Sequence, residues 1–193
     1  MSLAFFNYES AYGHLPPAAV CGPDGQPLLS WRVLILSFIE GEDLYKQFHL
    51  DEPWDSEHNH QFIDRMPKTY AAPWTKYVDV PPGHTLLKVF VGPGTPFEPG
   101  VKLKFTPDDF PDGRDETLLF VEAGDPVPWS KPDDIPFDRD RPLKLRGLFR
   151  DGYRAISAGG SPYLFIRYDC DEAALRAAVT RNGREDVPAP WAR

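Results

Sequence analysis

Apolar residues near the start of the chain recur with helical spacing. Leu3, Phe5, Tyr8 and Tyr12 fall roughly on one face of a helix, and Gly13 is a typical residue for a helix end. We therefore predict a helix over residues 4–12 that packs on a sheet through Phe5 and Tyr8.

Three further helical segments are expected before residue 70. The strongest periodicity follows Ser30, a favourable N-cap residue, and places apolar side chains at i, i+3, i+4 and i+7: Trp31, Leu34, Ile35 and Phe38. A short helix is expected around residues 44–48. The next helix, capped by Asp55 or Ser56, is expected to end before Pro67, because proline cannot continue a helix.

From residue 76 onward the pattern changes to the alternation and the β-type runs of strands. The predicted strands are residues 76–80, 85–91, 101–105, 117–122, 153–157 and 163–168. Asp169 or Asp171 then caps a last helix that ends at Gly183, with an apolar face of Leu175, Ala178 and Val179. Helices followed by strands favour an α+β fold with an antiparallel sheet, in one domain over residues 1–193.

Composition narrows the class of protein. The 193 residues include 22 prolines and 15 glycines without a period, which indicates long, ordered loops between short elements. The formal net charge of −8 argues against nucleic acid as a partner, because phosphate binding needs a basic surface. No apolar run approaches the roughly 18 residues of a membrane span, and the N-terminus lacks the pattern of a signal peptide.

Two acidic segments contain residue types that bind metal ions. In residues 51–60 the two histidines are spaced i, i+2 and cannot share a helix face, so a solvated helix start is the preferred interpretation. In the second segment an EF-hand fails, because placing Gly113 at the loop glycine puts Phe110 and Leu119 at ligand positions. A looser calcium loop and an exposed turn both stay open for its carboxylates, Asp108, Asp109, Asp112 and Asp115.

No motif identifies a reaction or a resident cofactor. Gly92-Pro93-Gly94 lacks the third glycine of a dinucleotide fingerprint, and Ser161 is not followed two residues later by the glycine of a nucleophile elbow. We therefore expect that the protein is not an enzyme. The candidate ligand-binding residues are tryptophans, which can stack on sugars or aromatic ligands or can instead anchor loops: Trp54, Trp74 and Trp129.

Two cysteines are too few for a disulfide scaffold or a cysteine-based zinc site. A bridge between Cys21 and Cys170 would close a loop of about 150 residues. Nothing in the sequence places the two within the ~7 Å that a disulfide needs, so we expect two free thiols.

Motifs along the whole chain resemble those of one known family. They are Asn7-Tyr8, Tyr12-Gly13, Leu15-Pro16-Pro17-Ala18, Ser30-Trp31-Arg32-Val33-Leu34, Leu44-Tyr45, Asp51-Glu52-Pro53-Trp54-Asp55, Asn59, Met66-Pro67, Tyr70, Val91-Gly92-Pro93-Gly94-Thr95, Phe97, Thr117-Leu118-Leu119, Val121-Glu122-Ala123-Gly124 and Val127-Pro128-Trp129-Ser130-Lys131-Pro132. Together they resemble the planctomycete-type pilin-like family of unknown function, also labelled a bacterial extracellular solute-binding family.

The resemblance implies a pilin-like fold, in which an N-terminal helix packs on an antiparallel sheet. It also implies a periplasmic or extracellular location at the cell envelope, with other pilin-like or secretion-system proteins as partners. Members usually begin with a prepilin leader and an apolar helix that crosses the membrane. That part is absent from this sequence, and membrane anchoring is expected only through it.

The chain departs from the family pattern at two places. Gly159-Gly160-Ser161-Pro162 stands where the family has Asp-Gly-Ser-Val, so any role of that acidic residue is in doubt. Ala72-Pro73 replaces a Cys-Pro pair, which weakens the case for a disulfide there.

Two functions follow as hypotheses. The first is a non-enzymatic, pseudopilin-like extracytoplasmic domain in envelope assembly or secretion. The alternative is an extracellular module that binds a solute through the tryptophans, or a cation such as calcium through the second acidic segment. An assembly domain exposes an apolar stripe on its N-terminal helix, whereas a binding module has a concave, aromatic-lined pocket.

Overall fold

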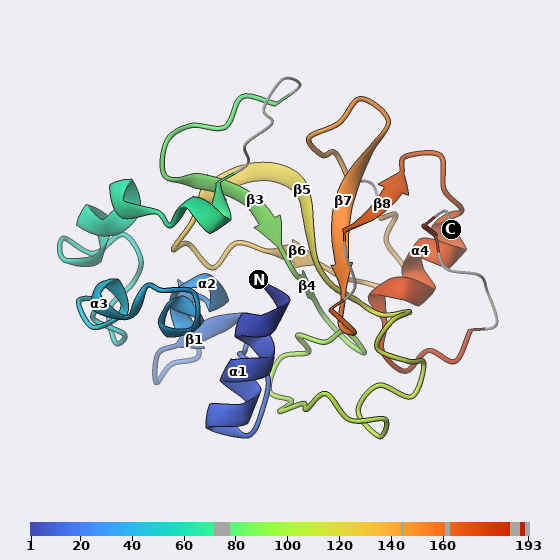
Figure 1. Cartoon of the computed structure of the whole chain (residues 1–193), viewed down its shortest axis with the longest axis horizontal. Coiled ribbons are helices and arrows are strands. Elements are labelled where there is room, and N and C mark those ends of the chain that lie inside the picture. Colours follow the sequence, from blue (N-terminus) through green and yellow to red (C-terminus); the bar gives the residue numbers. More distant parts are fainter. Residues whose placement is uncertain (72–77, 144, 161–162, 186–189, 192–193) are drawn as a thin grey trace.

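A four-stranded antiparallel sheet forms the centre of the fold (Figure 1). The computed structural model describes residues 1–71, 78–143, 145–160, 163–185 and 190–191. The strands lie in the order β3 (His84–Lys88), β5 (Leu118–Pro128), β7 (Gly152–Ser157) and β8 (Leu164–Arg167). Strands β1 (Ala19–Cys21) and β2 (Pro27–Ser30) form an antiparallel hairpin. The predicted antiparallel sheet is thus confirmed, and in addition β4 (Phe90–Val91) and β6 (Ile135–Pro136) form a small parallel pair that was not predicted.

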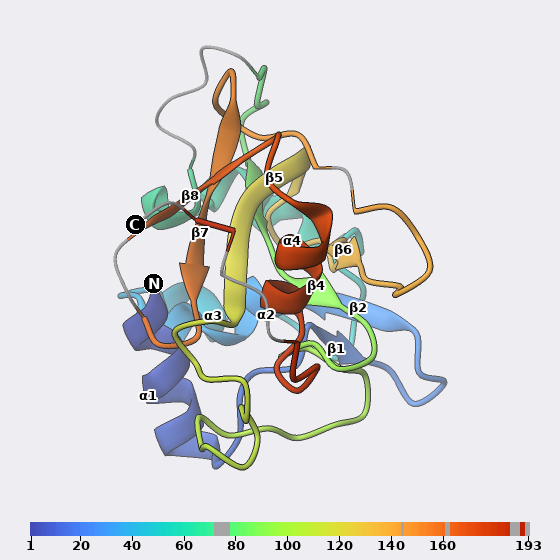
Figure 2. The ribbon, with the colours of Figure 1, turned by 90° about the vertical axis from the view of Figure 1, so that its right-hand side faces the viewer.

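Helices lie on both faces of this sheet (Figure 2). The N-terminal helix α1 (Ser2–Tyr12) covers one face, and α4 (Glu172–Val179) covers the other. The remaining helical segments are short: α2 (Trp31–Leu34), α3 (Glu42–Tyr45) and the 3-10 helices η1 (Leu36–Phe38), η2 (Asn59–Arg65) and η3 (Lys68–Tyr70). In the described part of the chain, no helix has the length and apolar character needed to cross a membrane.

The predicted N-terminal helix is confirmed. Phe5 is fully buried, and its ring centroid lies 6.1 Å from that of Phe120 on β5 and 5.2 Å from that of Trp31. Gly13 ends the helix with a positive φ of 76°, and its N–H donates to the Glu9 carbonyl. The mixed α and β composition, with an N-terminal helix against antiparallel strands, is therefore as predicted.

The helix predicted after Ser30 is shorter than expected. The Ser30 hydroxyl does accept from the Arg32 N–H as an N-cap, but the α-helix ends at Leu34 and continues as 3-10 helix. The segment with Phe62 is likewise 3-10 helix, and it ends before Pro67 as predicted. Both segments pack apolar residues into the first apolar cluster although most of their helical turns are 3-10 rather than α, so the periodicity indicated packing better than it indicated helix type.

The strand predictions fail where backbone groups find other partners. Residues 101–105 form no strand, because the Leu103 carbonyl accepts from Leu15 and the Phe105 N–H donates to Glu9. Residues 85–91 divide at Val89, whose N–H donates to the Asp134 carboxylate. Residues 78–80 are not a strand, residues 76–77 lie outside the described part, and the last helix ends at Val179, before Gly183.

Two apolar clusters pack on opposite faces of the sheet. The first joins α1, α2 and the 3-10 helices and contains Phe5, Trp31 and Phe120. The second lies under α4 and contains Val121 and Tyr153. Strand β5 supplies side chains to both clusters, Leu119 and Phe120 to the first and Leu118 and Val121 to the second, because a strand has side chains on both of its faces.

A buried ion pair links α2 to the sheet and to the segment after β5. The Arg32 side chain is fully buried and lies 3.1 Å from the Asp134 carboxylate, whose own side chain is 4% exposed. The same guanidinium donates to the carbonyls of Leu87 and Lys131. Asp134 also accepts from the Trp31 indole and from the Val89 N–H. Burial raises the pKa of Asp134, and these donors oppose that shift.

We predict that Asp134→Ala strongly destabilises the protein, because it leaves the Arg32 charge buried without its partner. The expected loss is about 3–5 kcal/mol in the free energy of unfolding, measured by urea denaturation. Glu42→Ala removes a solvent-exposed ion pair with Lys46 and serves as the control, for which no change is expected. Similar midpoints for the two variants would contradict this role of Asp134.

We also predict that Phe5→Ala costs about 3–5 kcal/mol of stability, because it empties an aromatic contact between α1 and the sheet. Leu3→Ala, on the same helix but 68% exposed, is expected to have little effect. The two unfolding curves, recorded side by side by circular dichroism, test whether α1 is an integral part of the core.

Candidate functional site

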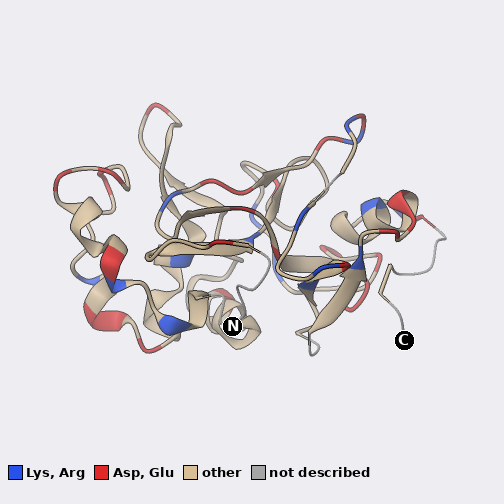
Figure 3. Ribbon diagram, turned by 90° about the horizontal axis from the view of Figure 1, so that it is seen from above, with Lys and Arg blue, Asp and Glu red and all other residues tan. Residues whose placement is uncertain are grey.

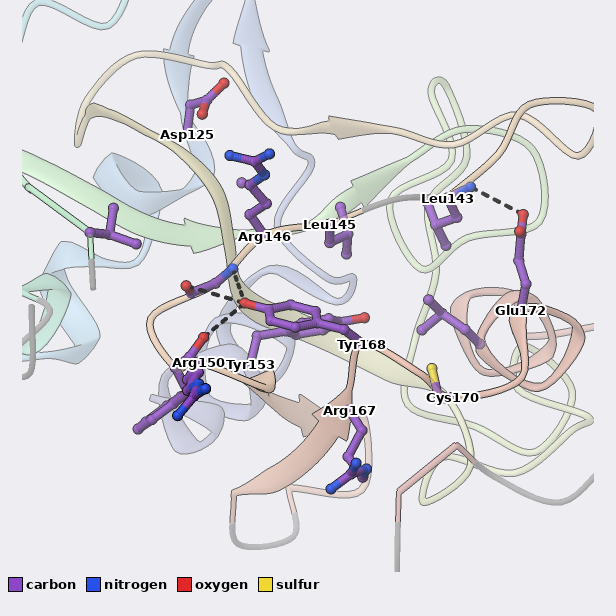
Figure 4. Close-up of a pocket in the computed structure, with 15 residues that line it drawn as sticks. Asp125, Leu143, Leu145, Arg146, Arg150, Tyr153, Arg167, Tyr168, Cys170 and Glu172 are labelled. Atoms are coloured by element: carbon purple, nitrogen blue, oxygen red, sulfur yellow. Dashed lines mark hydrogen bonds between the residues drawn. The ribbon is translucent and has the colours of Figure 1, made fainter. Parts of the chain in front are cut away.

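A cavity of about 750 Å³ lies beside the β7–β8 hairpin and the start of α4 (Figure 4). The segment 143–150 forms another wall, and the end of β5 contributes Gly124 and Asp125. Aromatic side chains from three places line it: Phe149, Tyr153 and Tyr168. The cavity is thus concave and aromatic-lined, as expected for a binding module.

Tyr168 holds the segment 143–150 in place. Its hydroxyl accepts a hydrogen bond from the Gly147 N–H at 2.8 Å and lies 3.1 Å from the Phe149 carbonyl, to which it donates. The Tyr168 side chain is still 42% exposed, so its ring remains accessible at the cavity. This side chain therefore both closes the wall and offers an aromatic surface.

Two further contacts shape the wall. Glu172, at the start of α4, accepts from the Leu143 N–H and from the Arg176 guanidinium, which ties the segment to the helix. Gly147 allows the close approach to β7, because a Cβ there would lie 2.3 Å from the Cβ of Tyr153. Any larger residue at Gly147 would push the segment away from the hairpin.

Tyr153 forms the inner wall and has an unsatisfied hydroxyl. The residue is 2% exposed, and no described residue makes a hydrogen bond to its hydroxyl oxygen. The ring centroids of Tyr153 and Tyr168 lie 6.2 Å apart. Burial, with smaller contributions from Cys170 and Tyr168, raises the pKa of Tyr153, so the hydroxyl keeps its proton and can donate.

Cys170 also lines the cavity, as a free thiol. Burial raises its pKa, and the neighbouring carboxylates of Asp169 and Asp171 raise it further. Such a thiol is a weak nucleophile at neutral pH, because the reactive species is the thiolate. Cys21, the other free thiol, is exposed on β1.

Charged side chains occur around the cavity as well. Arg167 pairs with Asp169, whereas the side chains of Arg146 and Arg150 make no hydrogen bond or ion pair with any described residue. Figure 4 shows these arginines extending from the tyrosine pair in different directions. Across the described chain, basic and acidic residues are interspersed (Figure 3). The cavity therefore lacks a converging set of cations.

The tryptophans proposed as ligand-binding residues do not line this cavity. Trp129 is fully buried, and its indole N–H donates to the carbonyls of Phe62 and Ile63, so it anchors the 3-10 helix η2. Trp54 is half-buried against the first apolar cluster, with the Lys131 ammonium 5.8 Å from its ring centroid. Trp74 lies outside the described residues.

The acidic residues of the second segment do not form a cation site in the described part of the chain, where no three His, Cys, Asp or Glu side chains are placed to hold a metal ion. The Asp109 carboxylate accepts a hydrogen bond from the Lys104 N–H, and the Asp112 carboxylate accepts one from the Arg184 N–H. The Arg181 guanidinium donates hydrogen bonds to the Asp109 carbonyl and to the Glu98 carboxylate. The positive charge in this region is therefore supplied by a side chain of the protein itself. Asp108 and Asp115 are exposed.

The motif residues behind the family resemblance have structural roles. Asn59 is fully buried, and its amide bonds the backbone of His49, Glu52 and Pro53. Gly92 sits where a Cβ would lie 2.1 Å from the Phe137 carbonyl, so β4 and the chain after β6 can approach closely. Asn59 and Gly92 therefore hold loops and strands together and do not line the cavity, whereas Gly124, another motif residue, does line it.

A second hollow of about 420 Å³ lies among residues 14–27 and 91–103, and five of its lining residues are prolines: Pro16, Pro17, Pro27, Pro96 and Pro99. It exposes few polar groups, and Cys21 lies at its wall. The residues that line it are all different from those that line the first cavity.

The sequence analysis missed the cavity residues. Tyr153 and Tyr168 were expected only as strand residues, and Cys170 only as a thiol near a helix start. The one usable signal was the alternation of apolar and basic residues from Leu143 to Arg146, which is typical of a segment with one buried side. Nothing local to these segments indicated that they meet.

Comparison with known proteins identifies the family of the chain. The chain belongs to a family of proteins of unknown function (DUF1559), also labelled a bacterial extracellular solute-binding family, which matches residues 1–116. No curated protein and no solved structure matches the chain. Apart from Val78, the residues that line the larger cavity lie beyond the matched region.

We predict that folding does not require a metal ion. Arg181 already supplies positive charge to the acidic segment, and the two apolar clusters provide the core. Adding EDTA is expected to leave the melting temperature unchanged, as is adding calcium chloride to the EDTA-treated protein. A marked rise with calcium would return the segment around Asp112 to consideration as a cation site.

Proposed function

We propose that the protein is an extracytoplasmic binding module that holds a small solute in the cavity between the β7–β8 hairpin, α4 and segment 143–150. The observation that carries the proposal is the aromatic-lined cavity of about 750 Å³, which has an unsatisfied hydroxyl at its wall. This volume lies within the range of small-molecule sites. The proposal includes no catalysis, because the cavity thiol is protonated at neutral pH and is therefore a weak nucleophile.

The arrangement of the cavity supports binding in a preformed site. Tyr168 and Glu172 fix its outer wall by hydrogen bonds, and β7 fixes its inner wall. Because these contacts already fix the walls, little further ordering of the protein is needed when a solute binds, and this favours affinity. The solute-binding label of the family and its extracellular setting agree with this function.

The pseudopilin-like role in envelope assembly is the second candidate. It is supported by α1, which packs on the antiparallel sheet and carries the exposed Leu3 and Tyr12. The apolar residues of the middle of α1, Phe5 and Tyr8, are buried in the same molecule, so they present no continuous stripe to a partner. For this reason we place solute binding first.

The two cysteines offer a direct test of solute binding. Cys170 lines the cavity, and Cys21 is exposed elsewhere, so one chain contains both the reporter and its control. The protein is screened by melting temperature against amino acids, monosaccharides, short carboxylic acids and small aromatic compounds. Each stabilising compound is then added during alkylation with iodoacetamide at alkaline pH, and the modified peptides are quantified by mass spectrometry.

We predict that a stabilising compound slows the alkylation of Cys170 several-fold and leaves that of Cys21 unchanged, because only the first thiol lies in the cavity. Equal alkylation rates with and without every stabilising compound would contradict binding at this site. Slowing at Cys21 alone would assign binding to the proline-lined hollow instead.

A further inference from the structure

We propose that the cavity selects an uncharged, mostly apolar solute that presents one hydrogen-bond acceptor to the Tyr153 hydroxyl. The inference rests on the proposed binding function and names the chemistry of its ligand. Three features support it: the apolar side chains near the Tyr153 hydroxyl, the positions of the charged side chains, and the protonated state of that hydroxyl.

The inner end of the cavity has one polar group that lacks a partner. The Tyr153 hydroxyl is buried and makes no hydrogen bond with any described residue. An unsatisfied buried hydroxyl costs free energy, and an acceptor atom placed against it recovers that cost. Because the Tyr153 hydroxyl stays protonated, it acts as the donor and the solute supplies the acceptor.

The surroundings of this hydroxyl are apolar. Figure 4 shows the hydroxyl end of Tyr153 directed toward the side of Cys170, away from the end where Tyr168 bonds Gly147. Leu143 and Leu145 lie on this side in Figure 4, and Leu175 also lines the cavity. The Cys170 thiol is neutral, and the Glu172 carboxylate on this side already accepts from the Leu143 N–H and from Arg176. A charged group placed here would therefore lose its hydration with little compensation.

The arginines of the cavity extend away from the tyrosine pair. Arg146, Arg150 and Arg167 extend in different directions, and Arg167 is already paired with Asp169. The Glu172 carboxylate is occupied by the Leu143 N–H and by Arg176. Ionic groups of a solute are therefore held at most at the rim, and the accessible ring of Tyr168 favours a flat apolar body inside.

Three probes of similar size separate the alternatives: acetophenone, which has a carbonyl acceptor; ethylbenzene, which has none; and benzoate, which is an anion. Their affinities are measured by titration of the full chain, followed through the backbone amide NMR signals of residues 146–150 and 168–175. Tyr153→Phe removes the hydroxyl. Tyr163→Phe, which is 59% exposed and does not line the cavity, is the matched control.

Acetophenone is expected to bind about two- to tenfold more tightly than ethylbenzene, the range that one net hydrogen bond supplies. Tyr153→Phe is expected to abolish this difference, and Tyr163→Phe to retain it. Benzoate is expected to bind more weakly than acetophenone.

Two results overturn the inference while leaving solute binding intact: equal affinities of acetophenone and ethylbenzene for the unsubstituted protein, or tighter binding of benzoate. The first means that solvent already satisfies the Tyr153 hydroxyl, and the second means that the rim arginines select the ligand. If no probe shifts the cavity amides and no screened compound protects Cys170, solute binding itself is wrong.

Discussion

The fold depends on the burial of one positive charge. The Arg32 guanidinium has no solvent exposure, and a buried charge is tolerated only when its donors are all directed at acceptors. Asp134 supplies the opposite charge, and the carbonyls of Leu87 and Lys131 accept the other bonds. Three segments that are distant in sequence must therefore meet around α2. This constraint also explains why the strand predicted over residues 85–91 divides, since the Val89 N–H is needed by Asp134.

The residues around this ion pair are different from those that line the cavity. Residues that carry the family resemblance, such as Arg32, Asn59 and Gly92, hold loops and strands on the face of the sheet covered by α1 or at its edge. The cavity lies with α4 and the β7–β8 hairpin, almost wholly beyond the residues that match the family. The residues that match the family thus supply much of the framework, and most of the residues that line the cavity come from the C-terminal part of this chain.

Within the cavity, position gives ordinary residues their chemical properties. Tyr153 on β7 and Tyr168 just after β8 have ring centroids 6.2 Å apart, yet the Tyr168 hydroxyl is satisfied by the backbone and the Tyr153 hydroxyl has no partner among the described residues. Cys170 is a weak nucleophile because it is partly buried between Asp169 and Asp171. An aromatic wall with one donor and no ion at its inner end follows from these placements, and it favours recognition of a neutral group.

The sequence by itself determined the elements whose signals are local. The spacing of Phe5 and Tyr8 with the stop at Gly13 predicted α1, the Ser30 side chain predicted a helix start, and the apolar runs predicted β7, β8 and α4. Only the tertiary structure decided how Arg32 meets Asp134, that Trp129 anchors a loop, and that Tyr153, Cys170 and segment 143–150 enclose a cavity. The reason is physical: caps and periodicity act within one turn or strand, whereas these contacts join residues tens of positions apart, and the free energy of burial that selects them arises only when the whole chain has packed.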